Sequence, residues 1–137
     1  VAKLGQRFSI RKILYDDTYA EDLTQRIEQG SYSDTGAELI APLGIEREPF
    51  KQTTMAYTAP SKEFERLISS HQLHHNGHPI MTWQVGHVTV YRDCNDNIRP
   101  MKPKDGGVKK VDGVVGAVMA LAGCMARQPT ASGIEIW

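Results

Sequence analysis

The spacing of apolar residues in the first half of the chain predicts a strand, a helix and a second strand, in that order. Residues 10–15 form a short aliphatic run that ends at two aspartates, which is typical of a buried strand. Residues 18–29 carry apolar side chains one helical turn apart, with Thr18 as the expected N-cap and Gly30 as the expected stop. Residues 38–43 are again mainly apolar and end at a turn. This order predicts a βαβ unit and therefore a parallel part of a sheet.

The second half of the chain has a weaker pattern until its last helix. Residues 45–59 have no clear period, and we expect a long connection there. A short helix opened by a serine N-cap is expected at residues 61–70. Residues 80–83 and 87–92 fit either two short strands or a helix followed by a strand. Residues 97–102 are expected to return as an edge strand.

The most apolar segment of the chain begins at a carboxylate. Asp112 precedes residues 113–122, which we expect to form a buried helix, and Asp16 and Asp17 close the first expected strand. A carboxylate at a helix start is favoured by the unpaired amides and the helix dipole, so one interpretation of Asp112 is an N-cap or a first-turn residue. The corresponding interpretation of Asp16 and Asp17 is a turn that caps the next helix. Carboxylates at the ends of core elements also suit a metal-dependent phosphodiesterase, because their hard oxygens bind Mg²⁺ or Mn²⁺. The pattern alone leaves both interpretations open.

Composition describes an ordinary domain without a strong net charge. The length of 137 residues is that of one domain with a real core. The 16 basic side chains balance 16 acidic ones, which argues against a strongly basic nucleic-acid module but leaves room for local basic patches. Cys94 and Cys124 match no zinc or redox spacing and fit a reducing compartment. Apolar runs are too short to span a bilayer.

Positive charge gathers shortly before Asp112. The side chains concerned are Arg99, Lys102, Lys104, Lys109 and Lys110. A DNA backbone that approaches bound metal ions needs such charge, and each phosphate contact makes binding more sensitive to salt. The alternative is a basic loop that is simply solvated.

A group of histidines forms a second polar feature. The four side chains are His71, His74, His75 and His78. Their spacing could supply zinc ligands. The neighbouring Asn76-Gly77 pair is a turn signal, however, so we favour ordinary solvent-exposed histidines on a loop.

Several segments over residues 10–122 keep an order and spacing that carry a family resemblance. These segments are residues 13–16, Gln52, and residues 61–68, 78–83, 95–98 and 109–115. Taken together, they resemble the nuclease domain of the large terminase subunits of tailed bacteriophages, the motors that package and cut viral DNA. The ordered set is far more specific than any one of its members.

The resemblance implies an α/β fold of the ribonuclease H type, a mixed sheet flanked by helices, whose acids hold two divalent metal ions, Mg²⁺ or Mn²⁺. It implies Asp16 and Asp112 as catalytic metal ligands, with Asp17 as the alternative acid at the first position. Another essential acid of the family lies on the first strand of the fold, which would precede Val1. We therefore expect residues 1–137 to be one partial nuclease domain that lacks the first strands and the ATPase domain and cleaves weakly or not at all by itself.

By the same resemblance, the intact protein is expected to cut concatemeric double-stranded phage DNA in the cytoplasm of a bacterial host. The implied partners are DNA, a portal protein and a small terminase subunit, with no membrane. One alternative is a Holliday-junction resolvase or another ribonuclease H-like nuclease, although residues 109–115 favour a terminase. Another is an inactive prophage remnant with only a docking role. His87 stands where the family often has asparagine, and we expect a histidine on a strand surface.

Overall fold

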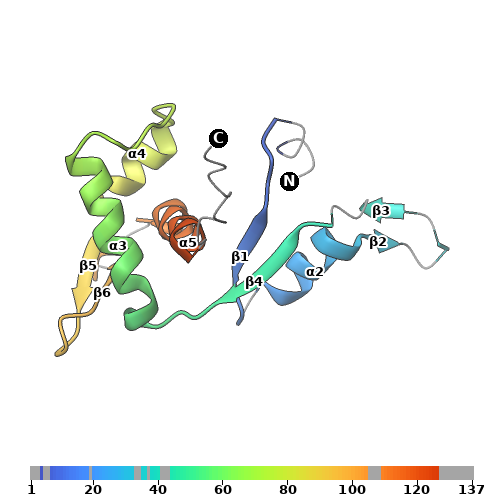
Figure 1. The fold of residues 1–137 in the computed structure, drawn as a ribbon, viewed down its shortest axis with the longest axis horizontal. Coiled ribbons are helices and arrows are strands. Elements are labelled where there is room, and N and C mark those ends of the chain that lie inside the picture. Colours follow the sequence, from blue (N-terminus) through green and yellow to red (C-terminus); the bar gives the residue numbers. More distant parts are fainter. Residues whose placement is uncertain are drawn as a thin grey trace, which may run out of the picture.

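Strands and helices are mixed along the chain, as in an α/β fold (Figure 1). The computed structural model describes residues 4, 7–18, 20–32, 35–36, 38–40, 44–104 and 109–126. In chain order the elements are β1 (Lys12–Asp16), α2 (Glu21–Gln29), β2 (Ser31–Tyr32), β3 (Glu38–Ile40), β4 (Glu46–Phe50), α3 (Thr54–Ser69), α4 (Pro79–Val85), β5 (Thr89–Arg92), β6 (Ile98–Met101) and α5 (Asp112–Ala126). Figure 1 shows α5 between two groups of elements, with α3, α4 and the β5–β6 pair on one side and β1, β4 and α2 on the other.

The first half of the chain is built on a parallel pair of strands, β1 and β4. Lys12 lies opposite Glu46, and Asp16 lies opposite Phe50, with α2 in the crossover between the strands. The predicted parallel pairing is confirmed, but its second strand was placed wrongly. The segment expected to pair with β1 contains β3, which instead pairs antiparallel with β2. β4 was not predicted, because Phe50 is its only buried residue and no run of apolar residues marks the strand.

The crossover helix α2 begins later than the pattern predicted. Its N-cap is Ala20, which makes no side-chain cap bond, so the prediction of Thr18 as the N-cap is wrong. Thr18 lies in the preceding turn, where its backbone N–H donates to Asp16 Oδ1 at 2.9 Å. The helix stops at Gly30 as expected, because a φ of 81° is easily reached only by glycine.

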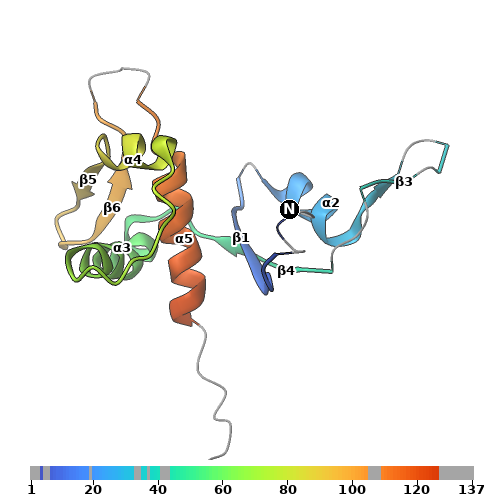
Figure 2. The same cartoon turned by 90° about the horizontal axis from the view of Figure 1, so that it is seen from above.

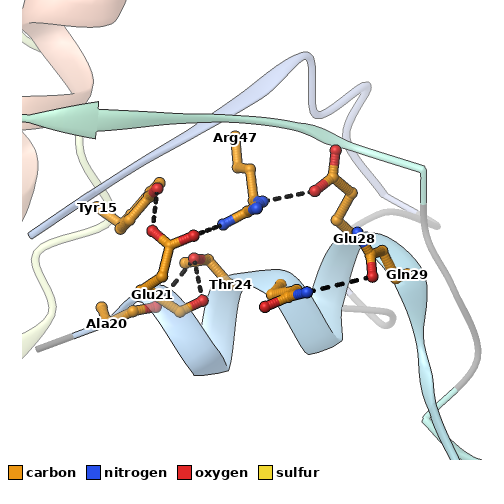
Figure 3. Close-up of polar contacts among 8 residues, drawn as sticks. Tyr15, Ala20, Glu21, Thr24, Glu28, Gln29 and Arg47 are labelled. Carbon is orange, nitrogen blue, oxygen red and sulfur yellow. Dashed lines mark hydrogen bonds and ion pairs between the residues drawn. The ribbon is translucent and has the colours of Figure 1, made fainter. Parts of the chain in front are cut away.

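Arg47 on β4 fastens α2 to the parallel pair (Figure 3). Its Nε donates to Glu28 at 2.5 Å, and its Nη1 donates to Glu21, whose other oxygen accepts the hydroxyl hydrogen of Tyr15. The guanidinium also lies 5.9 Å from the centroid of the buried Tyr15 ring. The bonds from Tyr15 and then Arg47 favour the charged carboxylate and lower the pKa of Glu21 below its usual value. One side-chain network thus ties both strands to their crossover helix.

α3 begins at Thr54 rather than at Ser61, so the expected connection over residues 45–59 is also wrong. Thr53 is the N-cap, and its hydroxyl accepts a first-turn amide hydrogen at 3.3 Å. The helix continues through the buried Pro60, although proline removes one helical hydrogen bond. A Pro-Ser pair resembles a helix start in sequence, but packing in the core sustains the helix across it.

The core lies where α3 and α5 meet the ends of the parallel strands. Phe50, Tyr57, Val118 and Met119 form its buried cluster. The rings of Phe50 and Tyr57 pack edge to face with centroids 4.9 Å apart, a favourable aromatic geometry. The predicted apolar helix is confirmed as α5, which buries one face with Val114, Val118 and Met119, crosses α3 and begins beside α4 (Figure 2). None of the described helices is long and apolar enough to cross a membrane.

A helix followed by an antiparallel hairpin occupies the segment whose structure the sequence left open. α4 precedes β5, and β5 pairs with β6, which confirms the expected returning strand. The outer edge of β6 is covered, because Thr58 Oγ1 on α3 accepts the amide hydrogen of Ile98 at 2.9 Å. Pro100, the next residue on that edge, has no amide hydrogen to leave unpaired. The hairpin is therefore docked on α3 by one of its edges.

We predict that Glu21→Gln flattens the acid dependence of stability. Because the folded pKa of Glu21 lies below the ordinary 4.5, its stabilisation is present above that pH and is lost as the pH falls through the folded value. Urea midpoints measured between about pH 7 and about pH 3 should fall less steeply for the variant than for the parent. Glu65→Gln is the matched control, because Glu65 is an exposed carboxylate without a hydrogen bond or ion pair to the described residues. Parallel pH profiles of Glu21→Gln and the parent would contradict the prediction.

Candidate active site

Asp16 lies at the edge where both parallel strands end. Its Cα partner is Phe50, so the chain that leaves β4 passes beside it. Asp16 is half-buried, and its Oδ1 accepts the amide hydrogen of Thr18 at 2.9 Å. Its Oδ2 receives no hydrogen bond from the described residues and is available to a ligand. The neighbouring Asp17 is exposed, and from the part of the chain that the structure describes it accepts only a long 3.5 Å bond, from the hydroxyl of Thr18.

Asp112 is the exposed first residue of α5. Its carboxylate makes no hydrogen bond or ion pair with any residue that the structure describes, so Asp112 is not a side-chain N-cap. It does lie in the first turn of α5, where the helix dipole favours an acid, as the other part of that interpretation held. The cap comes from α4, where Gln84 Oε1 accepts the amide hydrogen of Gly113 at 2.6 Å. Gln84 is only 8% exposed. A buried neighbour therefore satisfies this helix amide and leaves both oxygens of Asp112 uncommitted.

The two acids are carried by elements that pack against each other. Leu14 of β1 contacts α5 near its C-terminal end, where a Cβ on Gly123 would be 2.6 Å from Leu14 Cδ1, whereas Asp112 lies at the start of that helix. Oxygens without competing bonds suit Mg²⁺ or Mn²⁺, so the chemistry of Asp16 and Asp112 fits a divalent cation. Within the described ranges, no group of three or more histidine, cysteine or acidic side chains is arranged to hold a metal ion. Further ligands would have to come from outside those ranges or from water.

A polar cluster that the sequence did not reveal lies beside Asp16. Tyr57 OH donates to Gln52 Oε1 at 2.7 Å, and Gln52 Nε2 donates to the carbonyl oxygen of Phe50 at 3.0 Å. Gln52 belongs to a segment that carried the family resemblance, but nothing in the sequence assigned it a chemical role. Tyr57 fell within the expected connection, and no local pattern marks it as part of a site. Both side chains were brought here by the pairing of β4 with β1.

Arg99 reaches the same cluster from β6. Its Nη1 donates to the main-chain carbonyl of Gln52 at 3.5 Å, and its guanidinium lies 5.5 Å from the centroid of the Tyr91 ring. Burial raises the pKa of the Tyr57 hydroxyl above its ordinary value, and the bond to Gln52 opposes this shift. The negative charge of Asp16 adds to the shift, and the positive charge of Arg99 reduces it. Asp16 and Arg99 therefore both lie within electrostatic range of one hydroxyl group. Arg99 Nε is buried and has no hydrogen-bond partner among the described residues.

The other predicted basic residues flank a part of the chain that lies outside the described residues, 105–108. Lys102, Lys104 and Lys110 are exposed, and Lys109 is half-buried. All four lie between β6 and α5, so the chain leads from them directly to Asp112. Their contact with DNA stays a prediction.

Two of the four predicted histidines accept hydrogen bonds from the local backbone. His75 Nδ1 accepts a turn amide hydrogen at 3.0 Å, and His78 Nδ1 accepts one at 3.3 Å as the N-cap residue of α4. All four predicted histidines are exposed, which confirms the interpretation as solvated loop residues. His87 lies in the turn after α4 rather than on a strand, so that expectation is wrong. Its Nδ1 is 2.6 Å from the carbonyl oxygen of Trp83, and the two rings pack with centroids 4.7 Å apart.

A parallel strand pair with a crossover helix, and one uncommitted acid on each of two packed elements, define an α/β domain with a candidate carboxylate site. Residues 1–128 match the family described as "Terminase large subunit, endonuclease domain", and the chain belongs to this family. The chain is 42% identical to "Protein YmfN" of Escherichia coli (strain K12) over 67 residues, which are 48% of this chain and 14% of that protein. The crystal structure of the HK97 bacteriophage large terminase has a similar fold, with a TM-score of 0.65 and 18% identity over 89% of this chain and 23% of that one.

These comparisons confirm the predicted family and the predicted ribonuclease H-like α/β fold. Membership places the domain in the terminase large-subunit endonuclease family rather than with the Holliday-junction resolvases. The chain spans less than a quarter of the length of either relative, at 14% and 23%.

We predict that Gln84→Met destabilises the fold by about 1–2 kcal/mol, because it leaves the Gly113 amide without its buried acceptor. Gln84→Glu keeps an acceptor oxygen at the same position and should retain most of the stability at neutral pH. Chemical denaturation of both variants, with m values compared, measures the difference. Equal losses in the two variants would show that side-chain packing, rather than the cap, explains the effect.

Proposed function

We propose that this domain hydrolyses phosphodiester bonds in concatemeric double-stranded phage DNA, as the endonuclease part of a DNA-packaging large terminase subunit. The family match over residues 1–128 carries this proposal. The portal protein and the small terminase subunit are the proposed partners of the whole subunit, and the cytoplasm of the bacterial host is the proposed compartment.

Asp16 and Asp112 are the proposed ligands of two Mg²⁺ or Mn²⁺ ions, with Asp17 as the alternative acid on the first element. When bound, such ions activate a water molecule for attack and stabilise the leaving oxygen. The unpaired Oδ2 of Asp16 and the uncommitted carboxylate of Asp112 support this assignment. The proposal that the two acids act together rests on the family match, and α5, which begins at Asp112, packs against β1.

The positive side chains are proposed to bind the DNA backbone. Arg99 lies beside the Asp16 end of the strand pair, and Lys102, Lys104, Lys109 and Lys110 precede Asp112 along the chain. Phosphate contacts of this kind orient a duplex without reading its bases. The proposed nuclease would therefore select its substrate mainly by shape and charge.

We predict that Asp16→Asn and Asp112→Asn each lower Mn²⁺-dependent nicking of supercoiled plasmid by about 100-fold or more. An amide is a weaker metal ligand than a carboxylate, and the loss of several kcal/mol of charge stabilisation corresponds to this factor. Asp17→Asn should have a smaller effect, because Asp17 is the alternative acid. The assay uses a large subunit that carries this domain as well as the chain itself.

Asp22→Asn is the matched control, because Asp22 is an exposed acid paired with Arg26 on the far helix α2. If the Asp16 and Asp112 variants cleave as well as Asp22→Asn, these residues are not the ligands. A large subunit that neither cleaves DNA nor binds Mn²⁺ would favour the alternative of an inactive remnant with a docking role.

We predict that Lys102→Gln and Lys110→Gln each weaken binding to duplexes of unrelated sequence to the same extent. Each lost phosphate contact should reduce the slope of log affinity against log salt concentration by about 0.9. Fluorescence anisotropy over a salt series measures that slope. Lys12→Gln is the control, because Lys12 is already paired with Glu46 at 3.1 Å and Glu48 at 2.5 Å. An equal change in all three variants would point to net charge rather than to a defined contact.

A further inference from the structure

Gln52 lies at the joint between the elements that carry the two candidate acids. Its Nε2 donates at 3.0 Å to the carbonyl oxygen of Phe50, the Cα partner of Asp16 in the parallel pair. The same nitrogen lies 3.9 Å from Sδ of Met119, on the helix that begins at Asp112. One side chain thus contacts both the end of the strand pair and α5.

The amide of Gln52 is itself held in one orientation. Oε1 accepts the hydroxyl hydrogen of Tyr57 at 2.7 Å, while Nε2 must face the carbonyl oxygen of Phe50, because only the NH₂ group can donate to it. Tyr57 is 3% exposed and packs edge to face on Phe50, so the hydroxyl cannot move freely. The main-chain carbonyl of Gln52 accepts from Arg99 at 3.5 Å, which restrains the backbone as well. The joint is therefore pinned from three elements.

Such a joint matters for a metal site because ligand geometry tolerates little error. A site works when its ligands are held to within about 0.5 Å by neighbours that are locked themselves. Asp16 sits at the last position of β1, where a strand end is free to fray unless its partner strand is fixed. Gln52 fixes that partner at Phe50, and it does so from a position that also contacts α5.

We propose that Gln52 and Tyr57 are positioning residues that hold the Asp16 end of the strand pair in register with α5, so that Asp16 and Asp112 bind the same metal centre. This inference rests on the proposed nuclease function. The competing role is purely structural, in which Gln52 and Tyr57 only satisfy each other in the core. A structural role changes the free energy of unfolding, whereas a positioning role also changes metal affinity in protein that is fully folded.

The test compares Gln52→Met and Tyr57→Phe with the parent, in a large subunit that carries this domain. Methionine keeps the length of the side chain and its contact with α5 but removes both hydrogen bonds, and phenylalanine removes only the hydroxyl. We expect the dissociation constant for Mn²⁺ to rise about 10-fold for Gln52→Met and by a smaller factor for Tyr57→Phe, because supporting partners of metal ligands carry effects of about this size. Calorimetric titration with Mn²⁺ alone measures it, at a temperature where circular dichroism shows each variant to be folded.

Two controls separate this inference from the function on which it rests. Gln72→Met removes an exposed glutamine whose side chain, among the described residues, is bonded only to Arg66, and it should leave Mn²⁺ affinity unchanged. If Asp16→Asn abolishes Mn²⁺ binding while Gln52→Met and Tyr57→Phe bind like Gln72→Met, the positioning role is overturned and the proposed nuclease stands. If Asp16→Asn binds Mn²⁺ like the parent, the proposed function and the positioning role both fail. Recovery of cleavage by Gln52→Met at saturating Mn²⁺ would support the positioning role further.

Discussion

Parallel pairing of β1 with β4 sets Asp16 opposite Phe50, and most of the candidate site follows from that register. Parallel strands end at the same edge, so the chain leaving β4 has to pass beside Asp16 and brings Gln52 there. The pairing also requires a crossover, which α2 supplies and Arg47 fastens through its bonds to two glutamates of the helix. A shift in the register would separate the acid from the residues that now surround it.

Two backbone amides beside the core are satisfied by side chains from other elements rather than by residues nearby in sequence. Gln84 of α4 caps the amide of Gly113 at the start of α5, and Thr58 of α3 covers the edge of β6. Because buried donors need partners, these bonds stabilise the packing of the elements that they join. The cap from Gln84 has a chemical consequence as well, since the carboxylate of Asp112 makes no hydrogen bond to the described residues at the start of α5.

Local sequence patterns predicted an element correctly where its apolar residues form a continuous run. They did not predict an element whose burial depends on a partner far away in the chain. The apolar run of α5 and the aliphatic run of β1 were predicted because each is visible within a few residues. β4 was missed because it has one buried residue, and the start of α3 was misplaced because Pro60 resembles a helix boundary. The acids of the candidate site were predicted from their place in the chain and the family resemblance, whereas the neighbours Tyr57 and Gln84 were not.

The sequence by itself determined the family, through the ordered segments between residues 10 and 122, and it supplied the acids at the end of β1 and the start of α5. Tertiary structure alone decided that β4 pairs with β1, that Gln84 rather than Asp112 caps α5, and that Gln52 joins the two acid-bearing elements. The physical reason is the distance along the chain over which each kind of interaction acts. Periodicity records how one element meets the core, but strand register and side-chain hydrogen bonds join residues far apart in the chain, and only the folded chain brings them within reach.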